Sequence, residues 1–187
     1  MFPTFLSAPL ARGALSCALI AALASSAAAQ VRVRQVFGGG GTTGALYTQD
    51  FVELVNLGAP QSLAGWSLQS ASALGGTWSV APLPAVVLDS GRSFLVRYAS
   101  GSTLGAGQAL AVPTPDASTS LALAAGSGKL ALVSSTVALS GATPSSPVIV
   151  DFVGYGPTAS WNEPGAPFSA ASNAPSPGAE HALLRWN

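Results

Sequence analysis

Charged residues are scarce in this chain of 187 residues, where they make up 7% of the total, whereas a soluble domain usually carries about 25%. The 7 lysines and arginines are balanced by 7 aspartates and glutamates. Binding to nucleic-acid phosphates needs a basic face, so this composition argues against that class of function. Hydrophobic residues make up 49% of the chain, which is enough for a core and argues against a charge-rich disordered tail.

Cysteine and histidine are nearly absent, with one of each in the chain. A single cysteine excludes a disulfide framework, and a single histidine excludes most histidine-based metal sites. The acidic residues of the expected mature chain are scattered singly along it. A calcium site built from Asp116 or Asp151 with loop carbonyls stays open as an alternative, and we expect no cofactor.

The N-terminal residues have the pattern of a targeting segment. A short apolar stretch, residues 13–23, follows the positive charge of Arg12 and leads to a run of alanines ending at Ala29. This order fits a helical secretory signal peptide with a small-residue cleavage site. We therefore expect residues 1–29 to be removed and residues 30–187 to form one secreted or cell-surface domain. The alternative is an uncleaved membrane anchor; no later apolar run reaches the ~18 residues of a transmembrane helix.

The remaining sequence has the periodicity of short strands separated by glycine, proline, serine, threonine and aspartate clusters. No segment carries a convincing helical stripe, although residues 121–125 have room for one helical turn. The pattern predicts an all-β domain whose strands include residues 31–34, 51–55, 66–69, 86–88, 94–98, 129–133 and 148–153.

Two of these strands carry specific expectations. Alternation in residues 66–69 places Trp66 and Leu68 in the core and leaves Ser67 and Gln69 in water. We expect Trp66 to be largely buried between two sheets, near Leu54, Leu68 or Phe94. The strand at residues 148–153 is apolar on both faces apart from Asp151, as expected of a strand covered on two sides.

Several short motifs follow one another along the chain. They are Gln35-Val36-Phe37-Gly38-Gly39-Gly40-Gly41, Phe51-Val52-x-Leu54-x-Asn56, Leu63-x-Gly65-Trp66-x-Leu68, Phe94-Leu95-Val96, Gly128 to Thr136 and Asp151-Phe152-Val153-Gly154-Tyr155-Gly156. Their order resembles the lamin tail domain of nuclear lamins and of exported bacterial proteins. The resemblance covers residues 31–173 and implies an immunoglobulin-like β-sandwich of about seven to nine strands. It also implies a non-catalytic function, since bacterial lamin tail domains are often attached to exported hydrolases as non-catalytic modules.

Candidate catalytic groups are few. His181 is the only imidazole, and no nucleophile elbow accompanies it. Asp50 and Glu53 lie three apart on a strand, so they point to opposite faces and cannot flank one glycosidic bond. The segment 126–129 resembles the end of a nucleotide-binding loop, but Leu130 replaces the serine or threonine that holds Mg²⁺. We therefore expect no enzymatic activity.

An aromatic loop, residues 155–163, is the candidate binding surface. We expect Tyr155 and Trp161 to stack on a sugar or an apolar partner, and Asn162 and Glu163 to supply hydrogen bonds. The alternative is that Trp161 folds back over the end of the sandwich.

The function expected from the sequence is a non-catalytic exported interaction module that binds an extracellular protein or polysaccharide and no nucleic acid. Two alternatives stay open. One is a structural component of the envelope or matrix that self-associates, and the other is an accessory domain orphaned from an exported hydrolase.

Overall fold

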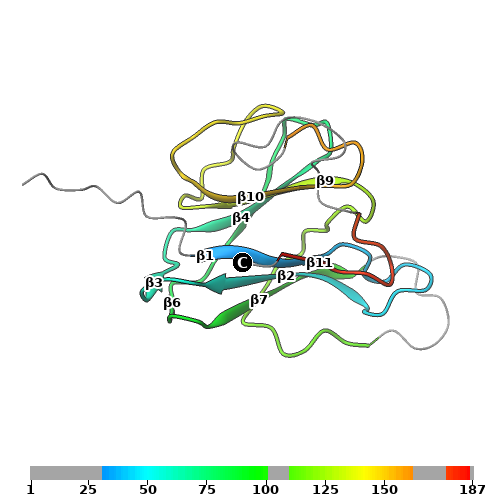
Figure 1. Ribbon diagram of the computed structural model, residues 1–187, viewed down its shortest axis with the longest axis horizontal. Coiled ribbons are helices and arrows are strands. Elements are labelled where there is room, and N and C mark those ends of the chain that lie inside the picture. The colour runs from blue at the N-terminus through cyan, green and yellow to red at the C-terminus, as the bar shows by residue number, and fades with distance from the viewer. Residues whose placement is uncertain (1–30, 101–109, 162–175, 186–187) are drawn as a thin grey trace, which may run out of the picture.

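The computed structural model describes residues 31–100, 110–161 and 176–185, and this part of the chain is all β, with no helix. Two main sheets form two layers (Figure 1): a five-stranded sheet in the order β11-β1-β2-β7-β8 and a four-stranded sheet in the order β10-β9-β4-β5. Strands β3 and β6 form a separate two-stranded sheet. No described segment is a helix long and apolar enough to cross a membrane. The expected signal peptide, residues 1–29, lies outside the described residues.

All seven stretches predicted as strands are strands, with boundaries within one to three residues. The structure adds four others, β3, β5, β8 and β11, of which three have only two residues. The bounds are β1 Val31–Phe37, β2 Gln49–Asn56, β3 Gln61–Ser62, β4 Ser67–Ser72, β5 Ser79–Pro82, β6 Val87–Leu88, β7 Ser93–Ser100, β8 Ala117–Ser118, β9 Gly128–Val133, β10 Ile149–Tyr155 and β11 Leu183–Leu184.

The main core lies between the two layers and is built from the inward-facing positions of both sheets. Burying each of its valines and leucines contributes about 1.5–3 kcal/mol. The five-stranded sheet supplies Val31, Val33, Val52, Leu54, Phe94 and Val96, and the four-stranded sheet supplies Leu68, Leu130, Leu132 and Val153.

The expectation that Trp66 is largely buried is wrong. Its ring is only partly buried and packs at the margin of the core, because Trp66 lies one residue before β4 begins. The turn that leads to it does use the expected glycine, since Gly65 has a φ of 76°. Among the described tryptophans, the buried one is instead Trp78, just before β5.

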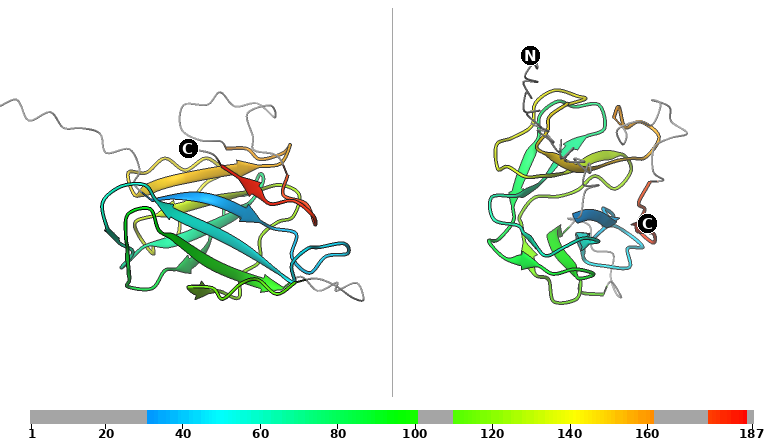
Figure 2. Two further views of the ribbon diagram at one scale, coloured as in Figure 1. Left: turned by 60° about the horizontal axis from the view of Figure 1, so that its bottom comes forward. Right: turned by 60° about the vertical axis from the view of Figure 1, so that its left-hand side comes forward.

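One lateral edge of the two layers is closed by β1 and β10, which lie side by side (Figure 2). Strand β11 pairs with β1 only at Gln35 and Val36. The backbone N–H of Val33 therefore needs a hydrogen-bond acceptor from another part of the chain. The Asp151 carboxylate accepts the backbone N–H of Val33 at 2.7 Å and pairs with Arg185 at 2.7 Å. Asp151, the single charged residue of its strand, thus fastens one sheet to the other.

One end of the core is closed by residues 121–124, which we call the crossing segment. The carbonyl of Leu121 accepts the N–H of Ala99 in β7, and the N–H of Leu123 donates to Asp50 in β2. The carbonyl of Ala124 accepts the hydroxyl of Tyr155 in β10. The segment therefore runs from one layer to the other as extended chain and forms no helical turn.

Candidate functional site

The outer face of the four-stranded sheet is covered by another part of the chain. Ser67 and Gln69 are fully buried there, so the expectation that they lie in water is wrong. The Gln69 side chain donates to the carbonyl of Val137 at 2.9 Å and accepts the N–H of Leu139 at 2.8 Å, while Ser67 donates to the carbonyl of Ser135. Alternation assigned both residues to the correct face, but residues 135–139 take the place of water.

Lys129 is a fully buried lysine on the same face. Its ammonium donates to the carbonyls of Gly75 at 2.6 Å and Ala142 at 2.7 Å, and to the hydroxyl of Ser160 at 3.2 Å. The Nζ also lies 5.5 Å from the centroid of the Trp78 ring. Burial lowers the pKa of this amine. As expected, Lys129 lies in a strand, and its cation fastens three loops together.

Three aromatic rings complete this covered face. Trp78 meets Trp161 edge to face with ring centroids 5.9 Å apart. The ring centroids of Phe152 and Trp161 are 3.6 Å apart. The indole N–H of Trp78 donates to the carbonyl of Gly141 at 3.0 Å. Trp161 therefore lies folded back, as in the alternative that the sequence left open, but on the outer face of the sheet and not over its end.

The candidate binding loop is divided by the structure. Tyr155 is only 1% exposed and ends strand β10, so the expectation that it belongs to an exposed loop is wrong. Its ring packs directly over Gly128, where a Cβ would lie 2.5 Å from the phenol oxygen. Asn162 and Glu163 lie outside the described residues. The four candidates are thus not shown together as one surface.

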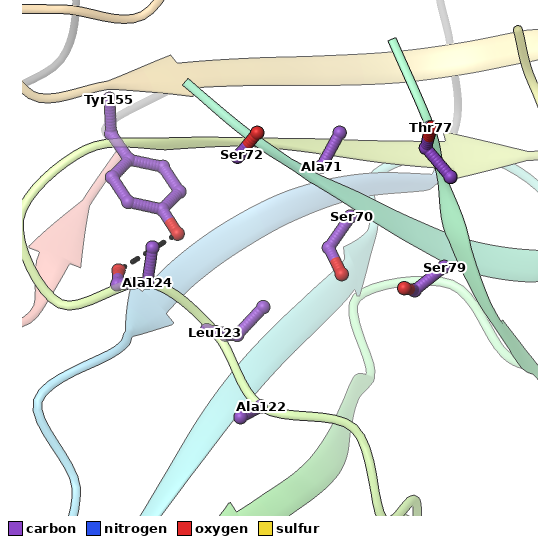
Figure 3. Close-up of a pocket in the computed structure, with 9 residues that line it drawn as sticks. All are labelled: Ser70, Ala71, Ser72, Thr77, Ser79, Ala122, Leu123, Ala124 and Tyr155. Atoms are coloured by element: carbon purple, nitrogen blue, oxygen red, sulfur yellow. Dashed lines mark hydrogen bonds between the residues drawn. The ribbon is translucent and has the colours of Figure 1, made fainter. Parts of the chain in front are cut away.

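A polar pocket of about 370 Å³ opens where β4 ends and β5 begins, above the crossing segment (Figure 3). Hydroxyl side chains make up much of its lining, and Tyr155 contributes its ring. The sequence reasoning missed this pocket, although serine stands at core-facing positions after Leu68. The lining residues are Ser70, Ala71, Ser72, Thr77, Ser79, Ala122, Leu123, Ala124 and Tyr155.

Buried titratable groups lie beside this pocket. The carboxylate of Asp50 accepts the N–H groups of Gly40 at 2.8 Å and Leu123 at 2.9 Å, and burial raises its pKa despite these bonds. Burial also raises the pKa values of Tyr98 and Tyr155. The Tyr98 hydroxyl has no hydrogen-bond partner within the described part of the chain.

A second, smaller depression of about 170 Å³ lies on the outer face of the five-stranded sheet. Its aromatic residues Tyr47 and Phe51 pack edge to face with centroids 5.5 Å apart. Glu53 at its rim pairs with exposed Arg34 at 3.4 Å. This face keeps the charged side chains that alternation places outward.

The described residues contain no group of three histidine, cysteine, aspartate or glutamate side chains placed to hold a metal ion. Of the two carboxylates considered for calcium, Asp151 pairs with Arg185, and Asp116 accepts the N–H of Leu95 at 2.7 Å. The single histidine, His181, is exposed.

Comparison with known proteins assigns no family: no protein-family model matches the chain, and no curated protein matches it.

Proposed function

We propose that this protein is an exported, non-catalytic binding module with an immunoglobulin-like β-sandwich of the lamin tail type. It binds an extracellular protein or polysaccharide through loops held on a rigid framework. The order of motifs along the chain and the two-layer arrangement of sheets support the fold. The apolar stretch and the alanine run of residues 1–29 support export.

The use of buried polar side chains is the observation that carries this proposal. Each of them binds backbone groups of a loop or a neighbouring strand, and so fixes the position of that loop. Asn56, for example, donates to the carbonyls of Ala59 and Leu88 and accepts the N–H of Gly58. Polar groups used in this way hold a framework for recognition. The buried ones are Asp50, Asn56, Ser67, Gln69 and Lys129, and half-buried Asp151 acts in the same way.

A binding screen that also follows the fate of the ligand tests the function. The protein is expressed from the full chain, immobilised, and exposed to purified envelope polysaccharides and to extracellular proteins of the producing cell. We expect saturable binding to at least one of them, with no cleavage of the bound polymer. Turnover of the polymer would contradict the proposal.

The same preparation separates binding from self-association. Sedimentation across a hundredfold range of concentration should show one species if the protein is a binding module. Concentration-dependent growth of large assemblies, together with no binding in the screen, would favour a structural component of the envelope or matrix.

A further inference from the structure

The polar pocket takes the hydroxyls of Ser70 and Ser72 from the end of β4 and of Ser79 from the start of β5, together with that of Thr77 just before β5. Along β4, Ser70 and Ser72 share the face of Leu68, which is in the main core. On β5, Ser79 pairs directly with Ser70, just as Ala81 pairs with Leu68. The inner face of this sheet therefore changes from apolar side chains to hydroxyls where the strands reach the crossing segment.

These hydroxyls have no protein partner in the part of the chain that the structure describes. No hydrogen bond there engages the side chains of Ser70, Ser72, Thr77 or Ser79. In Figure 3, the hydroxyls of Ser70 and Ser79 point into the space between the strands and the crossing segment. A hydroxyl both donates and accepts, so this cluster suits a ligand that is itself rich in hydroxyls.

The opposite wall of the pocket is apolar. Its accessible part is formed by Ala122 and Ala124 of the crossing segment, behind which Leu123 and the ring of Tyr155 are buried. The Tyr155 hydroxyl is already bonded to the carbonyl of Ala124 at 3.0 Å. A pyranose ring presents hydroxyls at its rim and C–H groups on its faces, so it matches a pocket with hydroxyls on one wall and hydrocarbon on the other.

The described residues around the pocket favour a neutral ligand. None of the nine described lining residues carries a charge. The Lys129 ammonium is on the opposite face of the sheet, and both oxygens of Asp50 are engaged by backbone N–H groups. The described lining thus offers no cation to an anion and no carboxylate ligand to a divalent metal.

We propose that this pocket binds a neutral saccharide unit, with the hydroxyls of Ser70 and Ser79 bonded to the sugar rim and the crossing segment packed against its C–H face. The inference rests on the proposed function and names its ligand class. The cavity volume of about 370 Å³ lies in the range of small-molecule sites, about 300–1,000 Å³.

Calorimetric titration of the protein with neutral trisaccharides tests this directly. The probes are cellotriose, maltotriose and xylotriose, with trigalacturonate as the charged counterpart. We expect at least one neutral trisaccharide to bind, to be retained at raised salt, and to be preferred over trigalacturonate. A preference for trigalacturonate, or no binding by any neutral trisaccharide, would overturn the assignment.

Two kinds of variant locate the site. Ser70→Ala combined with Ser79→Ala removes two hydroxyls, and Ala122→Phe obstructs the pocket while leaving all four in place. We expect each to weaken binding about tenfold or more, since two hydrogen bonds are lost or the sugar is displaced. The matched controls are Ser118→Ala on β8 and Ala85→Phe, both exposed and outside the pocket.

The outcomes separate the site from the function. Because Ala122 is exposed, its variant should fold even if the serine pair does not, and thermal melts check both. Unchanged trisaccharide binding in the folded Ala122→Phe variant would place the ligand elsewhere. Binding of a polymer or protein in the screen, with no trisaccharide bound, would overturn the pocket and leave the module function standing. Failure of both would overturn both.

Discussion

The outer faces of the two main sheets receive polar side chains by the same alternation, yet they place them in different surroundings. On the five-stranded sheet, Arg34 and Glu53 meet water and form an ion pair 3.4 Å long. On the four-stranded sheet, Gln69 and Lys129 are fully buried and bonded to loop backbone. Strand alternation thus decides which residues share a face, and the segment that covers the face decides what those residues do there.

The covered face should be the more sensitive of the two to loss of an aromatic ring. Trp78→Ala removes a ring buried against Phe152 and Trp161, and we expect a loss of about 3–5 kcal/mol in the free energy of unfolding. Trp66→Ala, at the margin of the main core, should cost markedly less. Urea denaturation followed by circular dichroism measures both, and equal losses would refute the distinction.

Two glutamines give a matched comparison of the faces. Gln69→Leu removes the hydrogen-bond partner of the part-buried carbonyl of Val137 and N–H of Leu139, so we expect a loss of about 1–3 kcal/mol. Gln35→Leu, on the open face, should change stability by no more than about 0.5 kcal/mol. A mild effect at Gln69 would mean that residues 135–139 do not cover the sheet in solution.

Tyr98 in the main core is a buried polar group of the opposite kind. Its hydroxyl has no hydrogen-bond partner among the described residues, whereas Gln69 and Lys129 are bonded to backbone carbonyls. We expect Tyr98→Phe to stabilise the protein by about 1 kcal/mol. The variant should also lose less stability in alkali. A folded-state pKa raised above the ordinary 10.0 means that stability is present below that pH and falls as the pH rises beyond it.

Thermal melts between neutral pH and the alkaline limit test both statements about Tyr98. Tyr155→Phe is the control, since its pKa is also raised but its hydroxyl donates to the carbonyl of Ala124. Like Tyr98→Phe, the Tyr155→Phe variant should lose less stability in alkali than the unchanged protein. At neutral pH it should be less stable than the unchanged protein. Destabilisation of Tyr98→Phe at neutral pH would show that the hydroxyl has a partner.

The main strands could be predicted from the sequence because their apolar residues alternate or run together, as in β2 and β9. The two-residue strands could not, since a pair such as β3 and β6 carries no periodicity. The role of Asp151 was partly visible, because one carboxylate in an apolar strand needs a partner. Its partners, Val33 and Arg185, come from distant segments and only the fold brings them together.

The candidate site was harder to predict for the same reason. Tyr155 and Trp161 flank a loop rich in small residues, a pattern typical of exposed aromatics. Both rings are instead used internally, by the crossing segment and by the covered face. The pocket hydroxyls at Ser70 and Ser79 did leave a signal, since serine stands where the alternation of Leu68 and Ala81 calls for an apolar residue.

Amine labelling of Lys129 tests most directly whether the outer face of the four-stranded sheet is part of the interior. Lys129 is the only lysine in the chain, so its modification is read by mass spectrometry without interference from other side-chain amines. We predict that a brief exposure to an acylating reagent leaves Lys129 unmodified in the folded protein and modifies it fully in urea. Labelling of Lys129 in the folded protein at the rate of a free amine would contradict the account.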